Sequence, residues 1–353
     1  MISAQLIAER LRHPHRRPEQ RRSHHDSSGR LPIKKPGKGS VDRLHQEARA
    51  ELLQDDIESV KVIPPRPIQF WPTQPPQSYL GQLEDSFQQD LFRARSCVTL
   101  EDCRFHQSVV ISNRDVIDGI WDLRGREEPF LGVTNFSSAR VLEFGPKSGY
   151  LTSYMETQGA QVVGFDIGWD VEPEVMSVSL QDRQPYCNEI LRATGAVQNS
   201  WWYHKRVNNL SAKMAYGNPC LLPVDLGMFD VAILGDYLPY QRDPWEILSQ
   251  VAQITRKRVV VTDILSSDGA SVTRDNLEHV SIWAPSGRDV STHWWAMTPG
   301  AVLDALRQLG FTRTRVTIHS QRQRVSSNLG HDSIVRYTEV PMFSVVADRE
   351  WSL

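Results

Sequence analysis

The sequence predicts an α/β protein built on a mostly parallel sheet with helices on both faces. Apolar strand-like runs alternate with amphipathic helical stretches from about residue 140 onward. A glycine-bearing turn joins the first of these strands to a helix, and the second strand ends in Asp166. Since consecutive parallel strands need a crossover connection, regular alternation of this kind predicts a parallel sheet covered on both sides.

The alternation gives a set of strands with helices between them. The predicted strands are residues 140–144, 161–166, 212–216, 229–234 and 258–263, with two late strands at 314–319 and 342–347. The predicted helices are residues 148–158, 186–206 and 244–255, and a last helix that Thr298 caps, Pro299 opens and Gly310 stops. A helical stretch at 79–95 and a β-rich piece at 105–120 precede the alternation.

Charge and composition divide the chain before this region. Residues 1–40 carry 10 Lys and Arg against 3 acidic residues, which predicts a disordered basic tail, while the rest of the chain is net acidic. Residues 41–78 predict a short helix and a proline-rich linker, and residues 79–114 a helical and extended extension. The main domain is expected at residues 115–353.

The cysteines and the hydropathy restrict the class of protein. The four cysteines show neither a disulfide pattern nor zinc-type spacing, so we expect reduced thiols, no metal site and a cytoplasmic location. No apolar run is long enough to predict a membrane-spanning helix. The sequence carries no signal for an oligomeric state.

The turn after the first strand reads EFGPKSG, from Glu143 to Gly149. A dinucleotide-binding turn needs G-x-G-x-x-G, because its second glycine lets the backbone approach a pyrophosphate. Lys147 stands at that second position, and only Gly145 and Gly149 remain. The turn therefore favours a ligand other than a dinucleotide.

The E-x-G-x-x-x-G pattern and its spacing to Asp166 resemble the cofactor turn of class I S-adenosylmethionine-dependent methyltransferases. The resemblance implies a Rossmann-like, seven-stranded sheet, mostly parallel with an antiparallel last strand, and S-adenosylmethionine (SAM) as cofactor. It also implies that turn amides meet the methionyl part, that Glu143 favours the ammonium, and that Asp166 accepts both ribose hydroxyls. The implied cofactor-binding residues are Glu143, Gly145, Lys147, Gly149, Asp166, Asn218 and Asp236.

Two departures from the family pattern lie further along the chain. Asn218 takes the place of the usual aspartate after the third strand, where it can accept a hydrogen bond from the adenine amino group without supplying charge. Tyr240 takes the place of a usual histidine after the fourth strand.

A narrower resemblance covers about residues 115–348. The segments WDLRGREEPFLG, WWYHKR and STHWWAMTPGAVLDALRQLGF resemble a bacterial methyltransferase group related to the wobble-uridine tRNA carboxymethyl transferases. These motifs do not encode the methyl acceptor, and they leave a modified SAM open as the cofactor.

Four residues are candidates for catalysis. Asp236 and Tyr240 follow the fourth strand, at the sheet edge where open α/β sheets bind ligands. Asp236 orients or deprotonates an acceptor hydroxyl, or else caps a turn. His204 and His293 are candidate bases beside tryptophan pairs, with a structural or exposed histidine as the alternative.

Candidate substrate-binding residues are Trp121, Arg124, Trp201 and Trp202. Arg124 can grip an anionic group, or it can pair with Glu127 or Glu128. The tryptophans can line a binding site for a carbohydrate or a planar metabolite, or they can pack in the core.

The sequence therefore predicts SAM-dependent methyl transfer to a small molecule or glycan, with O-methylation favoured because carboxylate and imidazole bases are available. RNA modification is the alternative enzyme function, although the acidic net charge of the main domain does not favour nucleic acid. A non-catalytic SAM-binding scaffold is the third possibility.

Overall fold

The structure is a computed structural model that describes residues 81–111, 115–132, 134–168, 171–175, 180–265, 282–283, 293–327 and 334–350. All of these residues belong to one compact unit. The predicted tail at 1–40 and the predicted linker at 41–78 lie outside the described residues.

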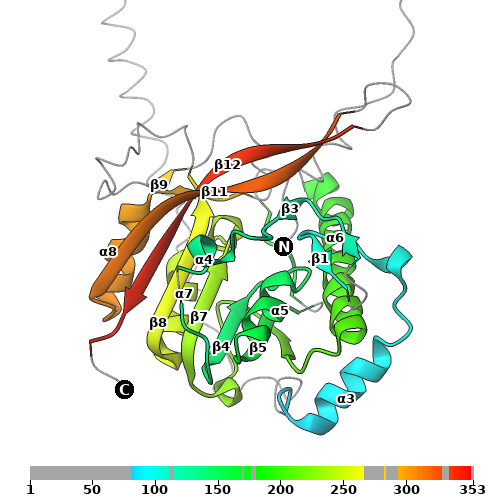
Figure 1. Ribbon diagram of the computed structural model, residues 1–353, viewed down its shortest axis with the longest axis horizontal. Coiled ribbons are helices and arrows are strands. Elements are labelled where there is room, and N and C mark those ends of the chain that lie inside the picture. The colour runs from blue at the N-terminus through cyan, green and yellow to red at the C-terminus, as the bar shows by residue number, and fades with distance from the viewer. Residues whose placement is uncertain are drawn as a thin grey trace, which may run out of the picture. The chain divides into compact units, whose positions relative to one another are not determined.

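The unit is built on one large sheet with the strand order β3-β11-β12-β8-β7-β4-β5-β6 (Figure 1). Strands β4 to β8 run parallel to one another. Strand β12 runs antiparallel to both β8 and β11, which confirms the predicted antiparallel last strand. The strands of this sheet are β3 (Trp121–Asp122), β4 (Arg140–Phe144), β5 (Gln161–Ile167), β6 (Lys213–Gly217), β7 (Phe229–Gly235), β8 (Thr255–Ile264), β11 (Arg313–Ser327) and β12 (Ile334–Asp348).

Two features of the sheet differ from the sequence prediction. The two-residue strand β3 pairs with β11 and adds an eighth strand. Strands β11 and β12 each span 15 residues, and toward Ser327 and Ile334 they reach beyond the apolar segments that predicted them. Backbone pairing across this ribbon continues where the side chains are polar, so hydrophobicity alone underestimates its length.

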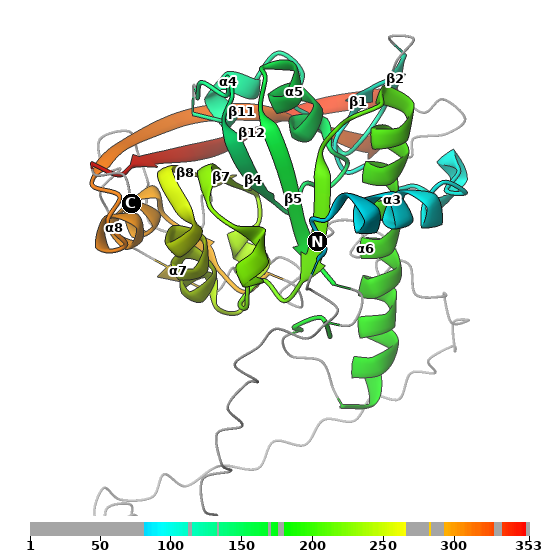
Figure 2. The ribbon, with the colours of Figure 1, turned by 90° about the horizontal axis from the view of Figure 1, so that it is seen from below.

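Helices cover both faces of the sheet (Figure 2). One apolar core joins Leu142 and Phe144 to helices α7 and α8, and a second joins Val141 to helices α4, α5 and α6. Alternate residues of β4 thus face opposite cores, as expected for a strand buried on both sides. The helices are α3 (Asp85–Ala94), α4 (Glu127–Phe130), α5 (Tyr150–Thr157), α6 (Leu180–Asn208), α7 (Pro244–Ile254) and α8 (Pro299–Gln308).

The start of α8 confirms the predicted cap, because the Thr298 hydroxyl accepts a hydrogen bond from the Ala301 amide. Helix α6 begins earlier than predicted and contains Pro185. The remaining elements are short: η2 (Leu100–Asp102), β1 (Val109–Val110), β2 (Val116–Ile117), η3 (Val224–Leu226), η4 (Leu238–Tyr240), β9 (Ile282–Trp283) and β10 (Ala296–Met297).

All four cysteines carry free thiols. Within the described ranges, the helices are too short or too polar to cross a bilayer.

Candidate functional site

The candidate site lies at the carboxyl ends of β4 and β7. These neighbouring parallel strands flank the point where the strand order changes direction, which is where open α/β sheets bind ligands. The glycine turn leaves β4 here, with Gly145 at φ 59° and Gly149 at φ 80°. A side chain on Gly145 would collide with the Tyr237 ring, since its Cβ would lie 2.5 Å from Cδ2. Both glycines are therefore required by the shape of the turn.

Lys147 and Asp236 face each other across this edge as a buried ion pair. The Lys147 ammonium lies 2.9 Å from Asp236 Oδ2 and 2.8 Å from the Asp236 carbonyl oxygen. The two residues also adopt left-handed backbone conformations, with φ of 57° and 48°. Such conformations cost a non-glycine residue about 1–2 kcal/mol, and strain of this kind concentrates at functional sites. Lys147 thus keeps the backbone conformation of the glycine it replaces while its side chain turns to β7.

A small cavity adjoins the pair. The volume in which the centre of a water molecule fits is about 10 Å³, which is roughly the room for one water. Its walls are formed by His106, Gln107, Trp121, Leu123, Phe130, Lys147, Gly235, Asp236 and Met342.

Three of the four predicted catalytic residues gather beside the pair. The Tyr240 hydroxyl donates to Asp236 Oδ1 at 3.3 Å, and the rings of Tyr240 and His293 lie 4.5 Å apart between centroids. The Lys147 ammonium also lies 5.9 Å from the centre of the Tyr240 ring. Asp236, Tyr240 and His293 are therefore close enough to act on one ligand.

His204 is placed differently. Its Nδ1–H donates to the Ser148 carbonyl oxygen at 3.1 Å, and its Nε2 accepts from the Asn208 side chain at 2.8 Å. The ring is buried, and burial lowers the pKa of His204 below its usual value. Because both nitrogens are engaged with the protein, this geometry does not support the expected role as a base. His204 instead ties α6 to the glycine turn.

Trp201 and Trp202 lie in the core rather than at the mouth of a pocket. Each is 1% exposed, and their rings pack edge to face with centroids 4.9 Å apart. The Trp201 indole donates to Thr152 and the Trp202 indole to the Tyr216 hydroxyl. This geometry does not support the expected substrate-binding role of the pair, because both rings are buried against Thr152 and Tyr216.

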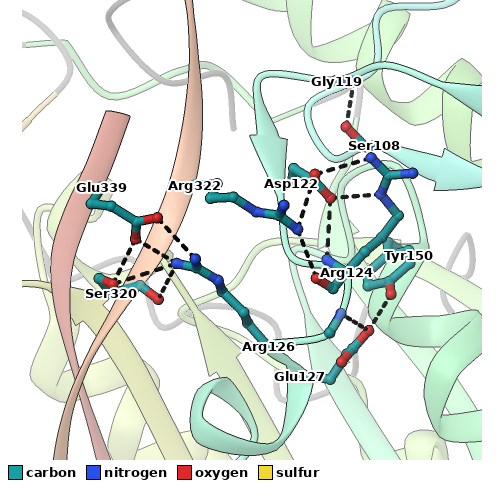
Figure 3. Close-up of polar contacts among 11 residues, drawn as sticks. Ser108, Gly119, Asp122, Arg124, Arg126, Glu127, Tyr150, Ser320, Arg322 and Glu339 are labelled. Carbon is teal, nitrogen blue, oxygen red and sulfur yellow. Dashed lines mark hydrogen bonds and ion pairs between the residues drawn. The ribbon is translucent and has the colours of Figure 1, made fainter. Parts of the chain in front are cut away.

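Arg124 pairs with Asp122, and neither of the two glutamates considered from the sequence is its partner (Figure 3). Its guanidinium contacts both carboxylate oxygens, at 2.7 and 3.0 Å, and Arg322 contacts the same carboxylate at 3.2 Å. Nearby, Arg126 pairs with Glu339, and Glu127 accepts a hydrogen bond from the Tyr150 hydroxyl. Arg124 is thus held by a protein carboxylate in a charge-balanced network.

Glu143 is buried on the α5 side of β4. It accepts a hydrogen bond from the Thr152 hydroxyl, which in turn accepts from Trp201. Burial raises the pKa of Glu143 to about 8, so its carboxyl group carries a proton at neutral pH.

Asp166 lies near the end of β5, and Asn218 directly follows β6. The Asp166 carboxylate accepts from the Ile167 amide and, at 3.3 Å, from the Gln198 side chain, which leaves lone pairs for further donors. Asn218 Oδ1 accepts from the Cys220 amide, so this side chain also shapes its own turn.

Two site residues were missed in the sequence interpretation. His106 belongs to the segment assigned to a separate extension, and nothing local in the sequence links it to the cavity. Tyr237 directly follows Asp236 in the sequence, and this adjacency could have identified it as a site residue. In the part of the chain that the structure describes, no cluster of three or more His, Cys, Asp or Glu side chains is placed to hold a metal.

Comparison with known proteins identifies the family. The model of the methyltransferase domain family matches residues 123–316, which is more than half of the chain. The chain therefore belongs to the methyltransferase domain family and is a SAM-dependent methyltransferase. No curated protein sequence matches the chain.

Solved structures with partial similarity include three named proteins. The N-terminal domain of EvdMO1 with SAH bound is 16% identical, with a TM-score of 0.41 over 74% of this chain and 97% of that chain. Magnesium protoporphyrin IX methyltransferase from Synechocystis PCC 6803 with bound SAH is 16% identical, with a TM-score of 0.37 over 62% and 78%. Precorrin 8W decarboxylase from Methanobacterium thermoautotrophicum is 13% identical, with a TM-score of 0.36 over 63% and 89%.

The residues beside the glycine turn fit this cofactor. Among the described residues the buried Tyr237 hydroxyl has no hydrogen-bond partner. Burial and the Asp166 carboxylate raise the pKa of Tyr237 well above its usual range, so the hydroxyl remains a donor. An unpartnered donor and a carboxylate with free lone pairs suit a ligand that carries hydroxyl and amino groups.

Proposed function

We propose that the chain transfers the methyl group of SAM to an oxygen atom of a small molecule or glycan. The observation that carries this proposal is the buried, strained Lys147–Asp236 pair beside the glycine turn, next to a narrow cavity. When bound, SAM supplies an activated methyl group on its sulfonium. The chain's own residues then have to hold the two reactants in line and exclude water.

On the cofactor side, the roles follow the chemistry of each group. The Asp166 carboxylate accepts hydrogen bonds from the ribose hydroxyls, and the turn amides between Gly145 and Gly149 meet the methionyl carboxylate. Asn218 contacts the adenine edge. Glu143 lies behind the turn and supports it through Thr152.

On the acceptor side, Asp236 is a hydrogen-bond acceptor whose charge Lys147 balances. Tyr240 and His293 flank it, and they orient the acceptor beside the carboxylate. The narrow cavity admits only the tip of a substrate, which favours a group the size of a hydroxyl.

The charges around the cavity favour an uncharged acceptor over a nucleic acid. Each guanidinium of the neighbouring network has a carboxylate partner in Asp122, Glu339 or Asp118. Binding a phosphate backbone requires cations that are free to replace its counterions. Free thiols at all four cysteines are compatible with the expected cytoplasmic location. The narrower relationship to the group near the tRNA carboxymethyl transferases stays a prediction.

The test is transfer of labelled methyl groups from SAM into fractions of a cell extract. We expect label in the small-molecule or glycan fraction, in products that resist nuclease. Asp236→Asn removes the carboxylate and should lower transfer by about 10²-fold, the lower end of what a positioned acid–base group contributes. Label that nuclease releases would show an RNA acceptor, and binding of SAM without transfer to any fraction would show a scaffold.

A further inference from the structure

His106 and Trp121 line the cavity, and both carry buried polar atoms without a hydrogen-bond partner among the described residues. Within the described part of the chain, neither imidazole nitrogen of His106 nor the indole nitrogen of Trp121 has a hydrogen-bond partner. The two residues are 2% and 4% exposed. Leaving a buried polar group without a partner is costly, so three such atoms on residues that line one cavity call for a ligand.

The imidazole and indole are not needed to hold their own segments in place. The His106 amide donates to the Ser148 hydroxyl at 2.7 Å, which fixes the segment on the glycine turn. The Trp121 amide donates to the His106 carbonyl oxygen at 2.9 Å. The backbone segments of Gln107 and Gly119 lie so close together that a Cβ on Gly119 would be 2.3 Å from the Gln107 carbonyl carbon. Backbone contacts thus position both side chains in the wall of the cavity and leave their polar atoms without partners among the described residues.

The cavity is matched to a neutral group that both donates and accepts. Burial and the nearby Lys147 ammonium hold the pKa of His106 well below its usual value, so the ring is neutral and offers one donor and one acceptor. Trp121 offers a donor, and the charge of Lys147 is already balanced by Asp236. Leu123, Phe130 and Met342 supply apolar walls. A carboxylate, phosphate or ammonium here would carry an uncompensated buried charge.

We infer that this cavity is the subsite for the alcohol hydroxyl of the methyl acceptor, with Trp121 donating to its oxygen and with His106 and Asp236 sharing the acceptor role for its hydrogen. The inference rests on the proposed function, because it assigns the group that receives the methyl. His106 and Trp121 are positioning residues of this subsite, and they come from the segment before the glycine turn.

Methanol titration of the ¹⁵N-labelled protein saturated with S-adenosylhomocysteine (SAH) tests this assignment directly. The Trp121 indole signal, assigned with Trp121→Phe, should shift saturably with methanol and should not shift with acetate. The Trp202 indole donates to Tyr216 at 2.8 Å in the core and serves as the internal control. A Trp121 signal that does not move, or that moves equally with acetate, overturns the inference.

Variants give a second readout. His106→Phe should lower methyl transfer to the small-molecule fraction about tenfold or more, as expected for losing a hydrogen bond to the substrate, while SAH affinity stays within about twofold. His106→Gln keeps a donor and an acceptor and should restore part of the transfer. Wild-type transfer by His106→Phe and Trp121→Phe would overturn the inference and leave the proposed function standing. Failure of the wild type to bind SAH would instead remove the proposed function. If a variant does not fold, the titration of the wild type decides.

Discussion

At the scale of single residues, the glycine turn is adapted by substitution rather than lost. Lys147 occupies a left-handed position that favours glycine, and it pairs with Asp236, which is left-handed as well. A buried pair of this kind is weak evidence for stability, because desolvation of both ions offsets their attraction. The backbone strain and the desolvation of the pair are better explained by a functional site at the carboxyl edge of the sheet.

Glu143 gives the first prediction, because its carboxyl titrates differently in the folded and unfolded chain. Burial raises its pKa from the usual value of 4.5 to about 8. Between these values the folded chain holds a proton that the unfolded chain releases. The contribution of Glu143 to the free energy of unfolding is therefore fully present below about pH 4.5 and is lost as pH rises toward 8. The loss should approach about 1.4 kcal/mol per pH unit in this window.

Glu143→Gln removes this titration and can still accept from Thr152 through its amide oxygen. Its free energy of unfolding in urea should fall much less than that of the wild type between pH 5 and pH 7.5. Parallel pH dependence in the two proteins would mean that Glu143 ionises normally in the fold.

At the scale of elements, the prediction from sequence succeeded where an apolar pattern has clear ends. Strand β4 was predicted with its observed bounds, and α7 and β7 to within one residue, because their apolar runs end at charged, proline or glycine residues. The long β11–β12 ribbon was underestimated because its backbone pairing continues into a polar half that has no apolar pattern to predict it. The side chains of α6 were misassigned, since adjacent tryptophans on a helix carry no signal of what covers them.

The attachment of α6 to the glycine turn gives a prediction at the scale of elements. His204→Phe removes the hydrogen bonds to the Ser148 carbonyl and from the Asn208 amide, which keeps its bond to the Val110 carbonyl, and the free energy of unfolding should fall by about 1–3 kcal/mol. Asn208→Leu keeps the bond from His204 to Ser148 but removes those to His204 and to the Val110 carbonyl, so it should cost a similar amount. If His204→Phe keeps wild-type stability but abolishes methyl transfer, His204 is a base after all.

At the scale of the whole molecule, one edge of the sheet collects residues that lie far apart in the sequence. His106 and Trp121 come from the start of the described unit, Lys147 and Asp236 from its centre, and Met342 from its last strand. The sequence could predict the residues that motifs place at strand ends. It could not predict His106, because only the docking of its segment on Ser148 brings the ring to the cavity.

The measurement that tests the central claim most directly is a calorimetric titration of SAH into the wild type and into Asp166→Asn. Asn keeps an oxygen that can accept from the Gln198 side chain, but it loses the charge and one of the two acceptor oxygens that the ribose hydroxyls need. The account predicts binding in the micromolar range for the wild type and a loss of at least about tenfold in the variant. Wild-type protein that does not bind SAH, or equal affinity in the two proteins, would contradict the assignment of this edge as the cofactor site.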